Sequence, residues 1–226
     1  MAKYKGKFIV LDGPDRCGKG TQLRLAADYL FNANKSMHVL MTREPTGISE
    51  HGKEMRRLLG SKQDPMKIAD RCLNLYVDDR WHHVTELVEP VIKYGGIAVS
   101  DRYKYSTAAY QLVQGVPQKR IVEAHKGLLK PDLVLIMLIT AEAAMKRAGR
   151  MGDGKEIFER LKFQEKVIEN YRRMKEIFPD ENIVFIDGMR SVQEVFGDVK
   201  AELDKLLGLA VPGSGKADTS ALAPAK

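Results

Sequence analysis

The chain has few of the features that mark secreted or membrane proteins. Only two of its 226 residues are cysteine, and Cys17 and Cys72 fit neither a disulfide framework nor a zinc-ligand spacing. No apolar run approaches the roughly 20 residues of a membrane span, and residues 8–11 are too short an apolar run for a signal peptide. We therefore expect a cytoplasmic protein without a membrane partner.

A concentrated basic tract is also missing. The chain carries 37 Lys and Arg against 30 Asp and Glu, a formal net charge of +7, which favours anionic partners. These charges are mixed along the whole sequence, unlike the basic arms of nucleic-acid-binding proteins. We expect small phosphates as partners and no nucleic acid.

Short apolar runs alternate with longer stretches of helical spacing. Strands are expected at 8–11, 37–41, 97–99, 133–139 and 183–186, and helical patterns cover 21–31, 69–94, 106–129 and 157–178. Such alternation predicts an α/β fold: a five-stranded parallel sheet with helices on both faces. The length suits a single domain, which we place at residues 1–209.

Two segments depart from the alternation. Residues 147–156 combine three glycines with Arg147 and Arg150, which favours a short mobile lid, a plain surface turn being the alternative. Residues 210–226 are rich in Ala, Pro, Gly and Ser and poor in apolar side chains, so this stretch is predicted to be a disordered C-terminal tail.

A phosphate-binding motif follows the first predicted strand and opens a helical pattern. In such a G-x-x-x-x-G-K loop, backbone N–H groups and the helix dipole converge on an anion while the lysine adds a mobile cation. The motif predicts binding of a nucleoside triphosphate by Gly13, Pro14, Asp15, Arg16, Cys17, Gly18, Lys19, Gly20 and Thr21.

The motif departs from its usual form after the lysine. Gly20 stands where Ser or Thr usually binds Mg²⁺, and Thr21 comes one residue later. We expect donor phosphates, water and Thr21, directly or through water, to hold the ion. The run from Gly18 to Gln22 resembles the loop of adenylate kinases, which is compatible with a nucleotide kinase.

Further motifs make the resemblance more specific. Residues 13–22 resemble the phosphate loop of thymidylate kinases, and Thr-Arg-Glu-Pro at 42–45 is similar to that family's segment after the second strand. Tyr76 and Arg80 fit its aromatic-x-x-x-Arg element, and residues 101–111 match Asp-Arg-x-x-x-Ser-Thr-x-Ala-Tyr-Gln. These motifs occur in the family's order between residues 7 and about 207, and they identify the chain as similar to thymidylate kinases.

The resemblance implies an activity and a set of contacts. Thymidylate kinases transfer the γ-phosphoryl group of ATP to dTMP with Mg²⁺, giving dTDP and ADP, and they are usually homodimers. In that family an acidic residue at the position of Asp15 reaches the acceptor sugar, and an aromatic at that of Tyr110 disfavours a 2′-hydroxyl. The implied dTMP-binding residues are Asp15, Arg43, Pro45, Tyr76, Arg80, Arg102, Ser106, Thr107, Tyr110 and Gln111.

The phosphoryl transfer that the resemblance implies requires positive charge near the phosphates more than it requires a general base. A monophosphate acceptor is already a nucleophilic dianion, so catalysis consists of positioning and neutralising phosphates. We expect Lys19, Arg16 and Arg102 to clamp the phosphates, with Asp15 beside them, while Arg147 and Arg150 close over the donor. Arg16 also matches the family type whose transition-state arginine lies in the phosphate loop.

Several alternatives stay open from the sequence alone. Tyr76 and Arg80 lie four residues apart, so they form either a base-binding face or an ordinary pair on a helix surface. The adjacent His82 and His83 point about 100° apart on a helix and are predicted to be solvated rather than metal-bound. A kinase for another nucleoside monophosphate and a nucleotide-dependent switch module remain as competing functions.

Overall fold

The computed structural model describes residues 6–61, 63, 64, 66–149 and 155–209, with the side chains of 155–159 excepted. Arg150, the middle of the expected lid and the expected tail at 210–226 therefore lie outside the described residues. No helix in the described part of the chain is long and apolar enough to cross a membrane.

A five-stranded parallel sheet forms the centre of the molecule, as the sequence predicts. The strands follow the order β2-β3-β1-β4-β5 and are all paired in parallel. They are β1 Lys7–Asp12, β2 Val39–Arg43, β3 Ile97–Asp101, β4 Leu133–Leu138 and β5 Ile183–Asp187.

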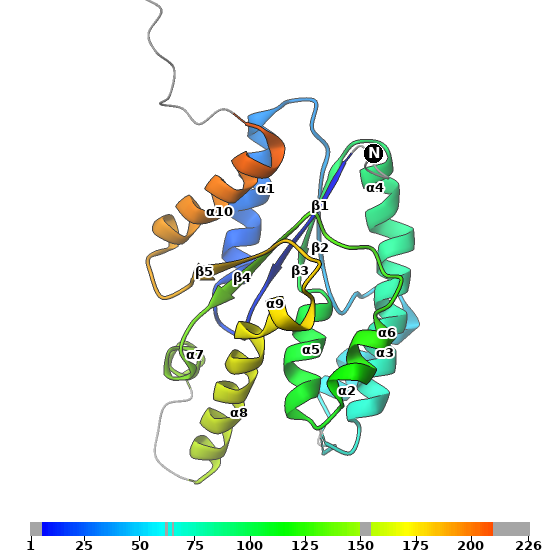
Figure 1. Ribbon diagram of the computed structural model, residues 1–226, viewed down its shortest axis with the longest axis vertical. Helices are drawn as coiled ribbons and strands as arrows, with labels where there is room; N and C mark the ends of the chain where they lie inside the picture. Colours follow the sequence, from blue (N-terminus) through cyan, green and yellow to red (C-terminus); the bar gives the residue numbers. More distant parts are fainter. Residues whose placement is uncertain (1–5, 62, 65, 150–154, 210–226) are drawn as a thin grey trace, which may run out of the picture.

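Helices cover both faces of this sheet (Figure 1). On one face lie α1 Lys19–Ala33, α7 Ala141–Arg147 and α10 Val192–Leu207. The larger group packs on the opposite face or beyond it: α2 Glu50–Leu59, α3 Ala69–His83, the π-helix η1 Val84–Val88, α4 Glu89–Lys93, α5 Lys104–Val113, α6 Gln118–Ala124, α8 Lys155–Arg172 and α9 Met174–Ile177.

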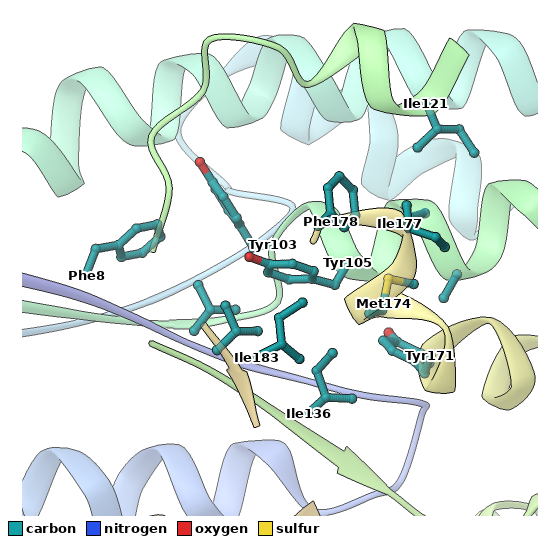
Figure 2. Packing of buried hydrophobic residues seen from close by; sticks show 14 of the residues in the cluster. Phe8, Tyr103, Tyr105, Ile121, Ile136, Tyr171, Met174, Ile177, Phe178 and Ile183 are labelled. Carbon is teal, nitrogen blue, oxygen red and sulfur yellow. The ribbon is translucent and has the colours of Figure 1, made fainter. Parts of the chain in front are cut away.

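The period-two alternation of β1 divides the core into two clusters. Phe8 and Val10 point into the cluster beneath α3, α5 and α8, and Ile9 and Leu11 point into the cluster beneath α1 and α10. All four side chains are fully buried because helices cover both faces of the sheet. Figure 2 shows the first cluster, in which the ring of Tyr105 lies near that of Phe178.

Several helices differ from the predicted ranges. The single helix expected over 106–129 is two helices, because Gly115 adopts a φ of +87° and Pro117 follows at the start of α6. The pattern at 69–94 continues through η1 into α4. Helices α2, α7 and α10 were not predicted, although Ser191 forms a capping box with Glu194 at the start of α10.

A buried ion pair joins the start of α5 to the segment before β5. The ammonium of Lys104 and the carboxylate of Glu181 are paired, with side chains 5% and 3% exposed. The hydroxyl of Tyr105 also donates to Glu181, and the Lys104 ammonium lies 4.9 Å from the centre of the Phe178 ring. Because both charges are out of water, each depends on the other.

We therefore expect Lys104→Met to lower the free energy of unfolding by about 3–5 kcal/mol, since it leaves the Glu181 carboxylate buried and unpaired. Adding Glu181→Gln should recover most of this loss, because the amide is neutral and still accepts from Tyr105. Urea denaturation of both variants and the parent measures the effect. Equal stability of the single and double variants would contradict the account.

Candidate active site

The candidate site lies at the carboxyl ends of the central strands, where parallel α/β sheets bind their ligands. Asp12 ends β1, Arg43 ends β2 and Asp101 ends β3. The phosphate loop follows β1 directly and leads into α1, so strand order brings these side chains to one edge of the sheet.

Two glycines shape the phosphate loop. Gly13 has a φ of +140°, and a Cβ there would lie 2.4 Å from the carbonyl oxygen of Met137, so a larger residue would collide with β4. Gly18 has a φ of +103° and caps the N-terminus of α1. The loop can therefore turn sharply enough to aim the first N–H groups of α1 at an anion.

Lys19 lies across its own loop. Its ammonium donates to the carbonyl oxygens of Gly13 at 2.9 Å and Pro14 at 2.8 Å, and lies 3.6 Å from the sulfur of Cys17. Cys17 is buried and packs into the cluster beneath α1. The loop thus holds a cation ready for phosphate oxygens, while Cys17 serves packing.

A buried carboxylate joins the phosphate loop to α5 and α8. Asp12 accepts from the backbone N–H groups of Gly13, Tyr103 and Ser106, and from the hydroxyls of Ser106 and Tyr171. These five donors come from the phosphate loop, the start of α5 and α8. Asp12 therefore fixes the position of all three segments around the site.

Arg102 is held rigidly beside the loop. Its backbone adopts a φ of +79°, a region that costs free energy for a residue with a side chain. Its guanidinium donates to the hydroxyl of Ser106 at 2.7 Å and to the carboxylate of Asp15. Arg16, at φ +65°, is the other non-glycine residue with positive φ in the described part of the chain.

Two cavities open at this edge of the sheet. The first has a volume of about 630 Å³ and the second about 190 Å³. The first is lined by Asp15, Arg16, Gly18, Lys19, Gly20, Thr21, Arg24, Arg43, Asp101, Arg102, Ala144, Met145, Ala148 and Gln164. The second is lined by Asp15, Glu44, Pro45, Met55, Leu59, Cys72, Tyr76, Arg80, Arg102, Tyr103, Ser106, Thr107, Tyr110, Gln111 and Gln114. Asp15 and Arg102 belong to both.

The first cavity contains oxygen atoms suited to a hydrated cation. Oδ2 of Asp101 accepts from Arg43 at 3.1 Å, whereas its Oδ1 is buried with no hydrogen-bond partner among the described residues. Thr21 also lines this cavity. Because Mg²⁺ prefers oxygen ligands and retained water, this carboxylate and hydroxyl fit a Mg²⁺ ion held mainly by phosphates.

Aromatic rings flank the second cavity. Burial raises the pKa of Tyr76 to about 12, and burial followed by the negative charge of Asp15 raises the pKa of Tyr110 well above its ordinary value. Both phenols are therefore neutral near pH 7. The Tyr110 hydroxyl is buried and lies beside the carboxylate of Asp15.

Neighbouring cations keep the carboxyl group of Asp15 ionised. Burial on its own would raise the pKa of Asp15, but the opposing charges of Arg102 and Lys19 bring it below the ordinary value. Asp15 is therefore ionised near pH 7, at the point where the two cavities meet.

Arg80 is buried, which is at odds with an ordinary helix-surface pair. Its Nε donates to Glu44 at 2.7 Å, and the exposed fraction of its side chain is 1%. His83 lies one turn further and donates from Nδ1 to the other oxygen of Glu44 at 2.8 Å. The prediction of a solvated His83 is therefore wrong, because a carboxylate from the β2 end draws this histidine into the core; His82 is exposed.

The loop after β2 is fastened to α3. Asp79 accepts from the backbone N–H of Thr46 at 2.7 Å and from the hydroxyls of Thr46 and Ser49. Ser49 in turn caps α2, since its hydroxyl accepts from the N–H of Gly52. These hydrogen bonds hold Pro45 and α2 beside the second cavity.

The structure separates some of the predicted site residues. Arg43, expected on the acceptor side, lines the first cavity, and Arg147 lines neither cavity but donates to the carbonyls of Arg16 and Gly188. Arg150 lies outside the described residues. Gly13, Pro14 and Cys17 are buried within the loop itself.

Sequence reasoning missed other cavity residues. Asp101 and Glu44 belong to the two motifs at 101–111 and 42–45. Because Asp101 ends β3 and Glu44 follows β2, their positions could have indicated that they lie at the site. Met55, Leu59, Cys72 and Gln114 carried none, because their side chains read as ordinary core or surface residues.

The fold and the two cavities define a class of protein. A parallel sheet, a glycine-rich loop opening α1 and a lysine at its mouth belong to P-loop kinases, and a second cavity beside the loop provides room for an acceptor.

Comparison with known proteins specifies the family. The sequence model of the family described as thymidylate kinase matches residues 11–199. A probable thymidylate kinase of Thermococcus kodakarensis is 34% identical over 89% of this chain and 98% of its own length. Thymidylate kinases of Desulfotalea psychrophila and of a Thermoanaerobacter species are 31% and 34% identical, over 93% and 90% of this chain and 100% of their own lengths. The chain belongs to the thymidylate kinase family.

Lys19 is the side chain whose loss should affect the chemistry most. We expect Lys19→Ala to lower turnover about 100-fold or more, because it removes a preorganised cation from the donor phosphates. Steady-state kinetics measures the loss, circular dichroism checks the fold, and Lys35→Ala, on an exposed turn, serves as the control. Turnover close to that of the parent in a folded Lys19→Ala protein would refute the phosphate-loop assignment.

Proposed function

We propose that this protein transfers the γ-phosphoryl group of ATP to dTMP, giving dTDP and ADP. The observation that carries the proposal is the meeting of two cavities at Asp15 and Arg102. A donor in the first and an acceptor in the second would bring their phosphates together at these two side chains. Membership of the thymidylate kinase family supports the choice of substrates.

The donor phosphates would bind along the loop between β1 and α1. Lys19 would exchange its two carbonyl partners for phosphate oxygens, and Arg16, Arg43 and Arg102 would add positive charge on the same cavity. Arg147, which already contacts the carbonyl of Arg16, would then flank the donor end of the site.

A Mg²⁺ ion would sit in the first cavity beside Asp101 and Thr21. When bound there, it would neutralise charge on the donor phosphates and orient them for transfer. The buried free oxygen of Asp101 is the feature that supports this position. Because Gly20 has no side chain, the metal ion would lack the hydroxyl ligand that this position usually supplies. Thr21 is the nearest hydroxyl that α1 offers in its place.

The acceptor base would enter the second cavity between apolar and aromatic walls. Tyr76 offers a ring for stacking, and Arg80, Thr107 and Gln111 offer polar groups at the end of the cavity that α3 and α5 form. Asp15 and Tyr110 would lie beside the sugar, where the bulk of Tyr110 would oppose a 2′-hydroxyl.

The transfer itself needs no general base from the protein. The acceptor phosphate arrives as a dianion whose oxygen is already nucleophilic, so the residues act by alignment and by stabilising the charge on the transferring group. Arg102 is suited to this role because Ser106 and Asp15 hold its guanidinium in place before any substrate binds.

The remaining expectations keep the status of predictions. They are a homodimer, a cytoplasmic location, a single domain over residues 1–209 and a lid near 147–156. Sedimentation of the purified chain measures the first of them.

Acceptor choice tests the proposal directly. dTMP should be phosphorylated with a higher specificity constant than dUMP, dCMP, AMP, GMP or UMP in a coupled assay with ATP. The preference over dUMP should be the smallest, about 10- to 200-fold, because the two bases differ by one methyl group in an apolar pocket. A higher specificity constant for AMP or UMP would overturn the assignment.

The metal shell gives a second test. Asp101→Asn should raise the Mg²⁺ concentration for half activity about ten-fold, and Thr21→Val should raise it less. Gly20→Ser should lower it, because the backbone there is helical and a Cβ would meet only Arg43, at 3.9 Å. The measurement is a Mg²⁺ titration at saturating ATP and dTMP.

Asp28→Asn, an exposed change on the outer face of α1, is the control for this titration. If the Mg²⁺ requirement were the same in the parent, Asp101→Asn, Thr21→Val and Gly20→Ser, none of these residues would belong to the metal shell.

A further inference from the structure

The guanidinium of Arg80 is surrounded by four partners from three parts of the chain. Glu44, directly after β2, accepts from Nε and also lies 2.7 Å from Nη2. Thr107 on α5 accepts from Nη2 at 3.1 Å, and the ring of Tyr103 lies 5.2 Å from the guanidinium carbon. The fourth partner is His125, directly after α6, which contacts Nη1 at 2.7 Å.

The tautomer of His125 follows from its two contacts. Nδ1 lies 2.7 Å from the carbonyl oxygen of Ile121, which can only accept, so Nδ1 must carry the proton. Nε2 is then a free acceptor for an N–H of Arg80, which can only donate. Burial, followed by the positive charge of Arg80, lowers the pKa of His125 well below its ordinary value, in keeping with this neutral form.

This contact decides how many N–H groups Arg80 has left. Nη1 carries two hydrogens, and Nε2 of His125 can accept only one of them. No residue in the described part of the chain accepts the other. Because Arg80 lines the second cavity, this remaining N–H is the donor that it can offer to a ligand there.

We propose that His125 is a positioning residue for recognition of the acceptor base: it takes one Nη1 hydrogen of Arg80 and thereby directs the other to a carbonyl oxygen of the base. The inference rests on the proposed function, since it assumes a pyrimidine in the second cavity. His125 itself does not line that cavity, so its effect on the substrate passes through Arg80.

The role requires an acceptor at this position and not just bulk. An apolar side chain of similar size would leave a buried N–H of a charged group without a partner, and the guanidinium would turn to satisfy it elsewhere. The guanidinium is planar and moves as one group, so this turn would tilt it against its bonds to Glu44 and Thr107 and would displace the second Nη1 hydrogen.

The test compares three variants with dTMP and with two deoxynucleotide analogues, each of which lacks one of the two carbonyl oxygens of the base. His125→Leu removes the acceptor, His125→Asn keeps an amide that is too short to place its oxygen where Nε2 lies, and His125→Gln can place its amide oxygen there. His38→Leu changes an exposed histidine before β2 and serves as the matched control. Specificity constants, KM for each substrate and thermal melting are measured for all of them.

We expect His125→Leu to raise KM for dTMP about ten-fold or more, the size of a lost hydrogen bond to a charged group, with KM for ATP unchanged. His125→Gln should restore most of the loss. With the analogue that lacks the carbonyl bound by Arg80, the penalty of the Leu variant should disappear, whereas the other analogue should keep it.

Other outcomes would overturn the inference. An equal penalty with dTMP and both analogues would mean that His125 only supports the fold, and no penalty would mean that it does not position Arg80. If His125→Leu does not fold, His125→Asn decides between the same outcomes. A wild-type protein that transfers no phosphoryl group to dTMP would end both this inference and the proposed function, whereas an active wild type with an unaffected variant would end only the inference.

Discussion

The buried carboxylate of Asp12 is the group on which the arrangement of the site depends. It lies at the end of β1 without exposure to solvent, and a carboxylate in that position is stable only if donors replace the water it has lost. Five donors do so, from the phosphate loop, from Tyr103 and Ser106 at the start of α5 and from Tyr171 on α8. The segments that line the two cavities are therefore arranged around one anion. A change in that carboxylate would disturb both cavities, although Asp12 lines neither of them.

Next to this anchor, two arginines of the candidate site adopt strained but well-supported backbone conformations. Arg102 and Arg16 have positive φ values that cost free energy, and such strain persists only where the surroundings enforce it. For Arg102 the enforcement is visible: its own N–H donates to Leu11, and Tyr103, the next residue, donates to Asp12. If Arg102 acts in phosphoryl transfer as proposed, a guanidinium fixed in advance would leave little reorganisation for that step.

The sequence correctly predicted the features that depend on residues close to one another in the chain. The strands, the phosphate loop and the acceptor motif all depend on residues near one another, and the sheet confirms the predicted alternation. It did not predict contacts between segments that are far apart in the sequence. His83 looked like an exposed neighbour of His82, because nothing within its own helix shows that Glu44, 39 residues earlier, would pair with it. Helix α2 was missed, and with it Met55 and Leu59, whose places in the second cavity depend on the attachment of Thr46 to Asp79.

The way in which Lys19 rests on its own loop has a consequence for which molecules the loop admits. Its ammonium already has two neutral acceptors, the carbonyls of Gly13 and Pro14, and a ligand must compete with them. Hydrogen bonds to ionised oxygens are about twice as strong as those to neutral ones, so a polyphosphate displaces the carbonyls readily, whereas a nucleoside or a sugar hydroxyl gains nothing by the exchange. If the loop binds donor phosphates as proposed, the resting position of Lys19 would therefore favour ionised phosphates over uncharged metabolites before any contact with a base is made.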